Sequence, residues 1–197
     1  MADEIQVDPK QLLFTLRTIC DELPAVDETS PPEGAMRLHE DDWREIEFVA
    51  SVNRDYIDQQ LAALAVFDQQ HRAKCGWTEV YVRKEHPSPL AAAGIHLDDE
   101  QPLAMSALTI SEPKRTVRGG FALSDGSGWF VYGQRAPDGL VVQMGVAASA
   151  SAMSRDFASQ LSHFATAAHL MLVDWYRNVI VDTTTTDAVL RWANRNP

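Results

Sequence analysis

The chain has 197 residues, a formal net charge of −11 and an apolar fraction of 45%. This length is typical of one domain with appendages, and folding would hide roughly 70% of the surface of the unfolded chain. The negative charge disfavours nucleic acid and anionic membranes as partners, because nucleic-acid-binding proteins usually place a basic patch against phosphate. The charge either keeps the protein soluble, which is the simpler explanation, or attracts a basic protein or peptide.

Cysteine usage and the N-terminal sequence favour the cytoplasm. Cys20 and Cys75 form neither a disulfide framework nor a Cys-x-x-Cys pair. The acidic N-terminus lacks the apolar stretch of a signal peptide, and no apolar run approaches the ~20 residues of a membrane span. We therefore expect free thiols in a cytoplasmic protein. The abundance of alanine, and of arginine over lysine, is typical of a GC-rich bacterial gene.

Residues 1–35 predict an N-terminal helix followed by a proline-rich linker. Asp8 can cap a helix that starts at Pro9. Pro24 ends the pattern, and proline and acidic residues follow it. The helix is expected to be an arm that docks on the domain or on a neighbouring subunit. Its apolar stripe at helical spacing is formed by Leu12, Leu13, Leu16, Ile19, Cys20 and Leu23.

The next segment predicts a short strand at 36–39 and then a long helix over about 41–74. Unbroken, this helix would be roughly 50 Å long, whereas a globule of this chain length is about 42 Å across. We therefore expect either a break at residues 51–53 or a helix that protrudes to meet another subunit. Its apolar face is formed by Trp43, Ile46, Val49, Ala50, Ile57, Leu61, Leu64 and Ala65.

The central part of the chain predicts an antiparallel β-meander. Turn sequences with glycine at the required positions occur at 124–128 and 136–139, and links this short force neighbouring strands to be antiparallel. Gly119 and Gly120 inside a strand pattern indicate a β-bulge or the close approach of a ligand or helix. The strand-like runs are 78–85, 103–111, 117–123, 129–134 and 140–147.

A last long helix is expected over about 151–181. Around Leu170, Met171 and Val173 the sequence is apolar almost all round, which is typical of a helix that is buried on more than one side. A polar break then separates it from a short closing helix within residues 183–197.

Together these patterns predict an α+β fold in which an antiparallel meander of four to five strands packs against long helices. The single domain is expected to span residues 36–182, with 1–35 and 183–197 as appendages. We expect a homodimer, because the helices carry more apolar surface than one sheet face needs. The expected interface residues are Leu12, Leu16, Ile19, Leu170, Met171 and Val173.

The standard catalytic, cofactor and metal motifs are absent from the sequence, so no cofactor or metal is expected. His71 and Cys75 share a helical spacing, but the thiol would lie at a helix C-terminus, where the dipole raises its pKa. His163 and His169 would face different sides of one helix, which disfavours a metal pair. The acidic run at 98–100 is the best local candidate for a cation or a basic partner.

Two functions remain open. The first is a non-enzymatic protein-interaction module of accessory, chaperone-like or inhibitor type, which acts as an oligomer. The second is a small-molecule-binding protein or enzyme with a pocket between the sheet and the C-terminal helix. A filled space between sheet and helix would exclude the pocket, whereas an apolar cavity of several hundred Å³ with buried polar groups would count against a pure interaction module. The residues expected at the pocket are Phe121, Trp129, Tyr132, His86 and Arg118.

Overall fold

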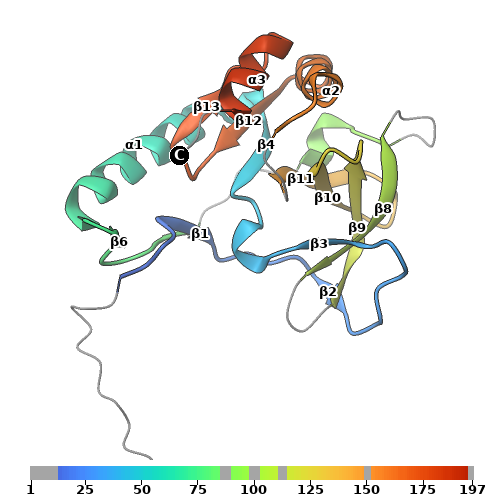
Figure 1. Cartoon of the computed structure of the whole chain (residues 1–197), viewed down its shortest axis with the longest axis horizontal. Helices are drawn as coiled ribbons and strands as arrows, with labels where there is room; N and C mark the ends of the chain where they lie inside the picture. Colours follow the sequence, from blue (N-terminus) through green and yellow to red (C-terminus); the bar gives the residue numbers. More distant parts are fainter. Residues whose placement is uncertain (1–12, 85–89, 98–102, 111–114, 149–151, 195–197) are drawn as a thin grey trace, which may run out of the picture.

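The computed structural model describes residues 13–84, 90–97, 103–110, 115–148 and 152–194 (Figure 1). Within these ranges a nine-stranded mixed sheet dominates the fold, and three α-helices pack against it. The expectation of a meander of four to five strands packed against long helices is therefore wrong. The reason is that several segments with helical periodicity in the sequence form buried strands.

Four consecutive antiparallel strands form one half of this sheet. The two turns expected between the last three strands are present, with Gly126 and Gly139 at positive φ. The strands are β8 (Ala104–Ile110), β9 (Arg115–Ser124), β10 (Trp129–Arg135) and β11 (Val141–Ala148).

The expected bulge is present in β9. Gly119 has positive φ and lies where the register between β8 and β9 shifts, since Thr116 and Phe121 face Thr109 and Ala107. A Cβ at Gly119 would also lie 2.3 Å from the carbonyl oxygen of Arg135 in the neighbouring strand.

The other half of the sheet comes from segments that the sequence assigned to helices. These strands are β4 (Ile46–Ala50), β12 (Leu170–Asp174) and β13 (Val179–Val181). β4 pairs antiparallel with β12 and joins the meander where Glu47 lies opposite Gly145 of β11. His169 and Asn178 adopt positive φ just outside β12 and β13. The helix expected over 151–181 is therefore wrong beyond residue 167.

Two short strands complete the nine-stranded sheet, namely β2 (Val26–Asp27) and β3 (Met36–Leu38). β3 lies in parallel beside β8, which confirms the strand expected at 36–39. β2 pairs with β9, so part of the expected linker belongs to the sheet. The strand order is β13-β12-β4-β11-β10-β9-β8-β3, with β2 beside β9.

The segment before residue 24 forms a strand where the structure describes it, not a helix. β1 (Thr18–Cys20) pairs in parallel with β7 (Tyr81–Arg83) in a separate two-stranded sheet. β5 (Arg72–Ala73) and β6 (Gly76–Trp77) form a second small sheet. The expected arm is therefore wrong from residue 13 onward, and residues 1–12 lie outside the described part of the chain.

The three helices are α1 (Arg54–His71), α2 (Arg155–Ala167) and α3 (Thr186–Ala193). The break expected at 51–53 is the junction between β4 and α1, so the sequence located the boundary but took a strand for a helix. Ser154 caps α2, because its hydroxyl accepts a hydrogen bond from the amide of Phe157. Short 3-10 helices lie at Glu40–Asp42 (η2), Ser51–Asn53 (η3) and Leu90–Ala93 (η4).

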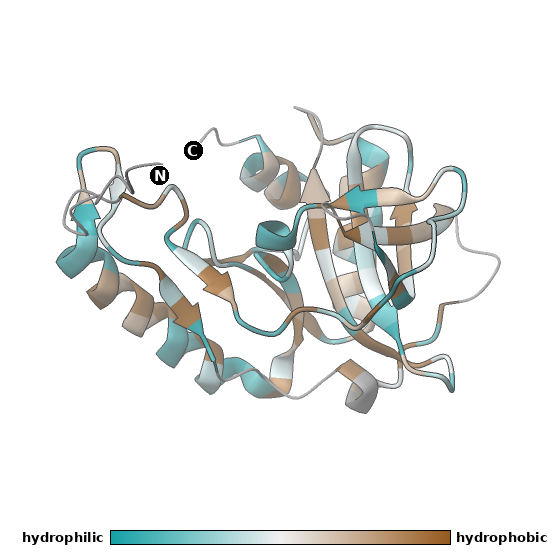
Figure 2. Ribbon diagram, turned by 90° about the horizontal axis from the view of Figure 1, so that it is seen from below, coloured by the Kyte–Doolittle hydropathy of each residue, from teal (hydrophilic) through white to brown (hydrophobic). Residues whose placement is uncertain are grey.

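The helices cover both faces of β4 and β12 (Figure 1). Leu172 packs in one cluster with residues of α2 and α3, whereas its neighbour Val173 packs with Ile57 and Leu64 of α1. When both faces of a strand are buried, its sequence is a continuous apolar run without alternation of polar and apolar residues. Figure 2 shows the resulting concentration of apolar residues on the strands. None of the helices in the described ranges combines the length and hydropathy of a membrane span.

Candidate functional site

A groove of about 490 Å³ lies between α2 and the meander. Its floor is formed by Leu123 of β9, Val131 of β10 and Met144 of β11. Val131 lies directly opposite Leu123 in the antiparallel register, so both side chains leave the same face of the sheet. Leu97 and Leu103 also line the groove. The sheet thus contributes an aliphatic surface with one flexible methionine.

The sheet-facing side of α2 forms the opposite wall. Phe157, Leu161 and Phe164 line the groove at spacings of four and three residues, which places them on one stripe of the helix. Phe157 and Leu161 are buried, whereas Phe164 is half-buried and packs edge-on against Phe48 of β4. This stripe anchors α2 while leaving the space beside it unfilled.

Polar side chains gather on the outer flank of α2, where the groove opens. Ser159 and His163 lie one helical turn apart and are exposed, and Gln160 beside them is half-buried. No aspartate, glutamate, lysine or arginine is found among the described residues that line the groove. The groove therefore combines an apolar interior with a hydrogen-bonding rim that carries no acidic, lysine or arginine side chain.

The structure does not bring together the five residues that were expected at a pocket. Phe121 and Trp129 belong to the same core cluster as the groove floor, but neither lines the groove. Tyr132 packs on the opposite face of the sheet. Arg118 is exposed and forms an ion pair with a carboxylate of β2. His86 lies outside the described residues.

The residues expected at a dimer interface are mostly parts of strands. The apolar surplus that suggested a dimer is formed by the two covered faces of β12, so the dimer remains a prediction without that support. Leu12 lies outside the described part of the chain. Leu16 and Ile19 are half-buried, and the buried members are Leu170, Met171 and Val173.

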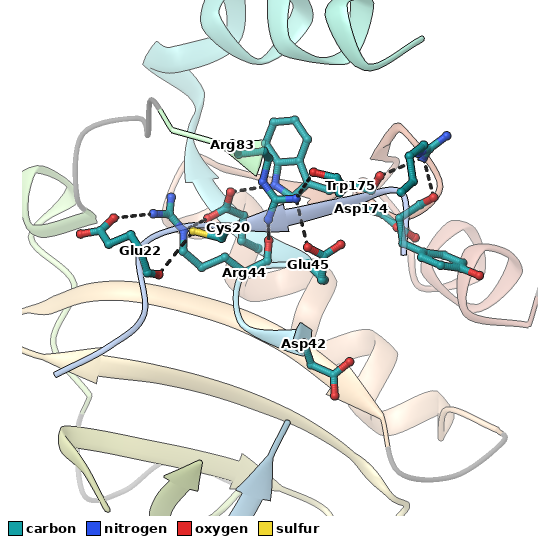
Figure 3. Close-up of polar contacts among 12 residues, drawn as sticks. Cys20, Glu22, Asp42, Arg44, Glu45, Arg83, Asp174 and Trp175 are labelled. Atoms are coloured by element: carbon teal, nitrogen blue, oxygen red, sulfur yellow. Dashed lines mark hydrogen bonds and ion pairs between the residues drawn. The ribbon is translucent and has the colours of Figure 1, made fainter. Parts of the chain in front are cut away.

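A second polar feature is a buried cluster of charges beneath β1 and β7 (Figure 3). Arg83 of β7 is 3% exposed. Its guanidinium donates hydrogen bonds to the hydroxyl of Thr18 at 2.9 Å, to Glu45 Oε1 at 3.0 Å and to the carbonyl of Arg44 at 2.9 Å. It also lies over the ring of Trp175. One arginine therefore connects four segments that are far apart in the sequence.

Arg44 makes the neighbouring set of contacts. Its Nε donates to Glu47 Oε2 at 2.6 Å and its Nη1 to Glu22 Oε2 at 3.0 Å. Its φ of 61° is unusual for a residue other than glycine, and the amide in this conformation donates to the Tyr132 hydroxyl at 2.7 Å. Glu47 also accepts a hydrogen bond from the indole nitrogen of Trp175 at 2.7 Å.

Two carboxyls of this cluster have raised pKa values because they are buried. Burial raises the pKa of Glu45 to about 7, although the adjacent Arg83 opposes the shift. The Oε2 atom of Glu45 is buried and has no hydrogen-bond partner. Burial also raises the pKa of Asp174, which accepts hydrogen bonds from the Trp192 indole at 2.8 Å and the Arg177 amide at 2.8 Å.

The charge cluster is closed to substrate, because its central side chains are almost completely buried. Its chemical role is to hold the small β1–β7 sheet against β4 and β12. Sequence reasoning missed it because its members are scattered along the chain and match no motif. The signal that could have found it is the run Arg44-Glu45-Ile46-Glu47, which places charges inside an otherwise apolar pattern.

The residue pairs considered as thiol or metal sites do not share a helix in the structure. α1 ends at His71, and Cys75 is exposed in the turn between β5 and β6. His163 lies on α2, whereas His169 follows its end. The acidic run at 98–100 falls outside the described ranges, and within those ranges no three His, Cys, Asp or Glu side chains are arranged to hold a metal ion.

Comparison with known proteins identifies no relative: no protein-family model, curated protein or solved structure matches the chain.

Proposed function

We propose that this protein binds a small, largely apolar molecule in the groove between α2 and the meander. The observation that carries the proposal is the groove itself, with about 490 Å³ of space and an apolar lining. Ligand pockets typically measure roughly 300–1,000 Å³ and combine hydrophobic walls with a few polar groups. Both properties are met between Val131, Met144 and the aromatic side chains of α2.

The energetics of packing support this proposal. Protein interiors are close-packed, and unfilled apolar space costs stability. The groove adjoins the largest buried hydrophobic cluster of the described residues, so its unfilled space lies against the core. A bound apolar molecule would remove wall surface from water, and each Å² is worth about 25 cal/mol.

The expected protein-interaction module has less support. Its structural argument was a surplus of apolar helix faces, and the apolar segments concerned are buried strands of the sheet. The acidic net charge remains, and it is explained by solubility. We also propose that the protein is cytoplasmic and does not bind nucleic acid. This proposal is favoured by the two free cysteines, Cys20 and Cys75, and by the negative charge.

Binding of an uncharged fluorescent dye tests the proposal. N-phenylnaphthylamine gains fluorescence in apolar surroundings, so titration of the protein should give a saturable signal. Ala167 is an exposed residue of α2 at the groove, and Ala167→Trp should obstruct the opening and reduce dye affinity at least about tenfold. Ala63→Trp places the same side chain on an exposed position of α1, away from the groove, and should leave the affinity unchanged.

The proposal fails if the dye does not bind saturably, or if both tryptophan variants bind it as the unmodified chain does. Circular dichroism of both variants verifies that each retains the fold, which is expected because both alanines are exposed.

A further inference from the structure

We infer that the ligand of the groove is an uncharged amphiphile, with an apolar chain on the sheet and a hydroxyl or carbonyl head group at Ser159, Gln160 and His163. This inference rests on the proposed function and narrows it to one ligand class. It follows from the size of the groove, from the distribution of polar atoms along its walls and from the charges around it.

The volume limits the ligand to a medium-sized molecule. The groove of about 490 Å³ lies in the lower half of the roughly 300–1,000 Å³ range of small-molecule pockets. An aliphatic chain of about ten carbons with a small polar head suits this range. A phospholipid with two long chains is too large for it.

The distribution of polarity gives the ligand two ends. The floor residues Leu123, Val131 and Met144 are buried and apolar, which suits an alkyl chain. Methionine is unbranched and polarisable, so Met144 can adapt to a chain of variable shape. The polar side chains lie where the groove opens, so the head group lies at the entrance beside the half-buried Gln160 while the chain lies inside.

The head group is uncharged because the described lining offers no opposite charge. Transfer of a carboxylate or an ammonium from water to an apolar groove is costly unless the ion is paired. The nearest polar partners, Gln160 and Ser159, supply a donor and an acceptor without net charge. A hydroxyl or carbonyl group makes the same hydrogen bonds at a much smaller desolvation cost.

Two sources of negative potential also disfavour an anionic head group, namely the C-terminal end of α2 and the net charge of the chain. His163 lies in the last turns of α2, which ends at Ala167, and the C-terminal end of a helix carries partial negative charge. The chain as a whole carries a formal net charge of −11. A cationic head group would be attracted at long range, but salt screens that attraction beyond about 10 Å, and no described lining residue is a carboxylate.

Three ligands with the same ten-carbon chain test this inference on the unmodified protein. Decanol, decanoate and decylamine compete with N-phenylnaphthylamine at about pH 7.5, where the carboxylate and the ammonium are ionised. Decanol is used below its solubility limit, and the two ions are used below their critical micelle concentrations. We expect decanol to bind at least about ten times more tightly than either ion.

Variants on α2 locate the head group. Gln160→Leu and His163→Leu should each weaken decanol binding about threefold to tenfold through the loss of one hydrogen bond, while dye binding is retained. Gln160→Lys should raise decanoate affinity at least about threefold, because it supplies the missing positive charge. Gln59→Leu and Gln59→Lys, at an exposed position of α1, are the matched controls and should change neither affinity.

The outcomes separate the two proposals. Saturable dye binding with decanoate or decylamine equal to decanol, or with no displacement by any of the three, overturns the uncharged amphiphile and leaves the apolar binding site standing. Retention of decanol affinity in both leucine variants overturns the placement of the head group. Absence of saturable dye binding refutes the proposed function itself.

Discussion

The guanidinium of Arg83 on β7 lies over the indole of Trp175, with its central carbon 5.0 Å from the ring centroid. The contact links two sheets, because Arg83 lies on β7, which pairs with β1, whereas Trp175 directly follows β12 of the large sheet. Arg17 makes a parallel link by donating a hydrogen bond to the Trp175 carbonyl at 2.9 Å. The side chains of Arg17 and Arg83 thus hold the small sheet against the large one, which is not joined to it by hydrogen bonds between paired strands in the described ranges.

Replacement of Arg83 should destabilise the protein strongly. Arg83→Met removes three hydrogen bonds and leaves the buried carboxyl of Glu45 without its cation. Breaking a buried ion pair from one side typically costs about 3–5 kcal/mol. Urea denaturation above pH 7, where Glu45 is ionised, should show a loss of this size in the free energy of unfolding.

Arg118→Met is the matched control for this loss. Arg118 pairs with Asp27 at 2.8 Å, but both side chains are exposed, and exposed pairs contribute at most about 1 kcal/mol. Equal losses in the two variants would show that the buried contacts of Arg83 do not hold the sheets together.

Stability should fall as the pH rises toward neutrality because of Glu45. Burial raises the pKa of this carboxyl from 4.5 to about 7 in the folded chain. Between these two values the folded chain binds more protons than the unfolded chain, so the free energy of unfolding decreases as the pH rises. The contribution of Glu45 is fully present below about pH 4.5 and is lost above about pH 7, with a size on the order of 3 kcal/mol.

Glu45→Gln tests this pH dependence. The amide oxygen keeps an acceptor for Arg83 but has no proton that titrates in this range. The stability of the variant should therefore change less between about pH 5 and pH 7 than that of the unmodified chain. Glu33→Gln, at an exposed carboxylate, is the control and should leave the pH profile unchanged. A profile that is identical in both variants would exclude Glu45 as the source.

Trp192 fastens α3 to the end of β12. Its indole nitrogen donates to Asp174 Oδ2 at 2.8 Å, and the Asp174 carboxyl is buried. Trp192→Phe should lower the free energy of unfolding by about 1–3 kcal/mol, because the hydrogen bond to a buried carboxyl group is lost. Trp77→Phe removes the same type of bond to Asp68, which is more exposed, and denaturation of both variants should show the smaller loss there.

The meander could be predicted because its signals are local. Glycine-containing turns separate alternating strands, and the side chains of β11 alternate between the two faces of the sheet. The closing helix α3 was also predicted, since its start follows a polar break at residues 182–186. These features depend on residues that are close together in the sequence.

The remaining strands could not be predicted, because the partners that determine them are distant. In β12 the run Leu170-Met171-Leu172-Val173 is apolar at every position, since α1 covers one face and α2 and α3 cover the other. Without alternation, periodicity does not distinguish such a strand from a buried helix. β1 pairs with β7 across more than sixty residues, and no local pattern reports that pairing.

One wall of the groove could be predicted from the sequence, but its floor could not. Phe157, Leu161 and Phe164 have helical spacing inside the segment that was expected to be a helix, and they form one wall of the groove. The floor was misassigned because β10 is apolar on both faces, so Tyr132 was placed on the wrong one. Leu97 and Leu103 join the groove through long-range packing that their sequence context does not indicate.

Gly145 marks the place where the two halves of the large sheet meet, and its substitution tests that architecture. A Cβ at this position would lie 2.6 Å from the carbonyl oxygen of Ile46 in β4 and 2.6 Å from the Tyr132 ring of β10. Glycine to alanine normally stabilises a protein by about 0.4–1 kcal/mol where the backbone permits it. Here Gly145→Ala should instead cost about 1–3 kcal/mol, because β4 or the Tyr132 ring must move.

Gly126→Ala separates this steric effect from backbone strain. Gly126 lies in the β9–β10 turn at positive φ with no atom within 4 Å of an added Cβ, so alanine there should cost only about 1 kcal/mol of conformational strain. Urea denaturation measures both losses. Near-ultraviolet circular dichroism should change only in Gly145→Ala, because the hydroxyl of Tyr132 accepts from the Arg44 amide and loses that position when its ring is displaced. A Gly145→Ala variant that is as stable as the unmodified chain would contradict the close approach of β4 to β11.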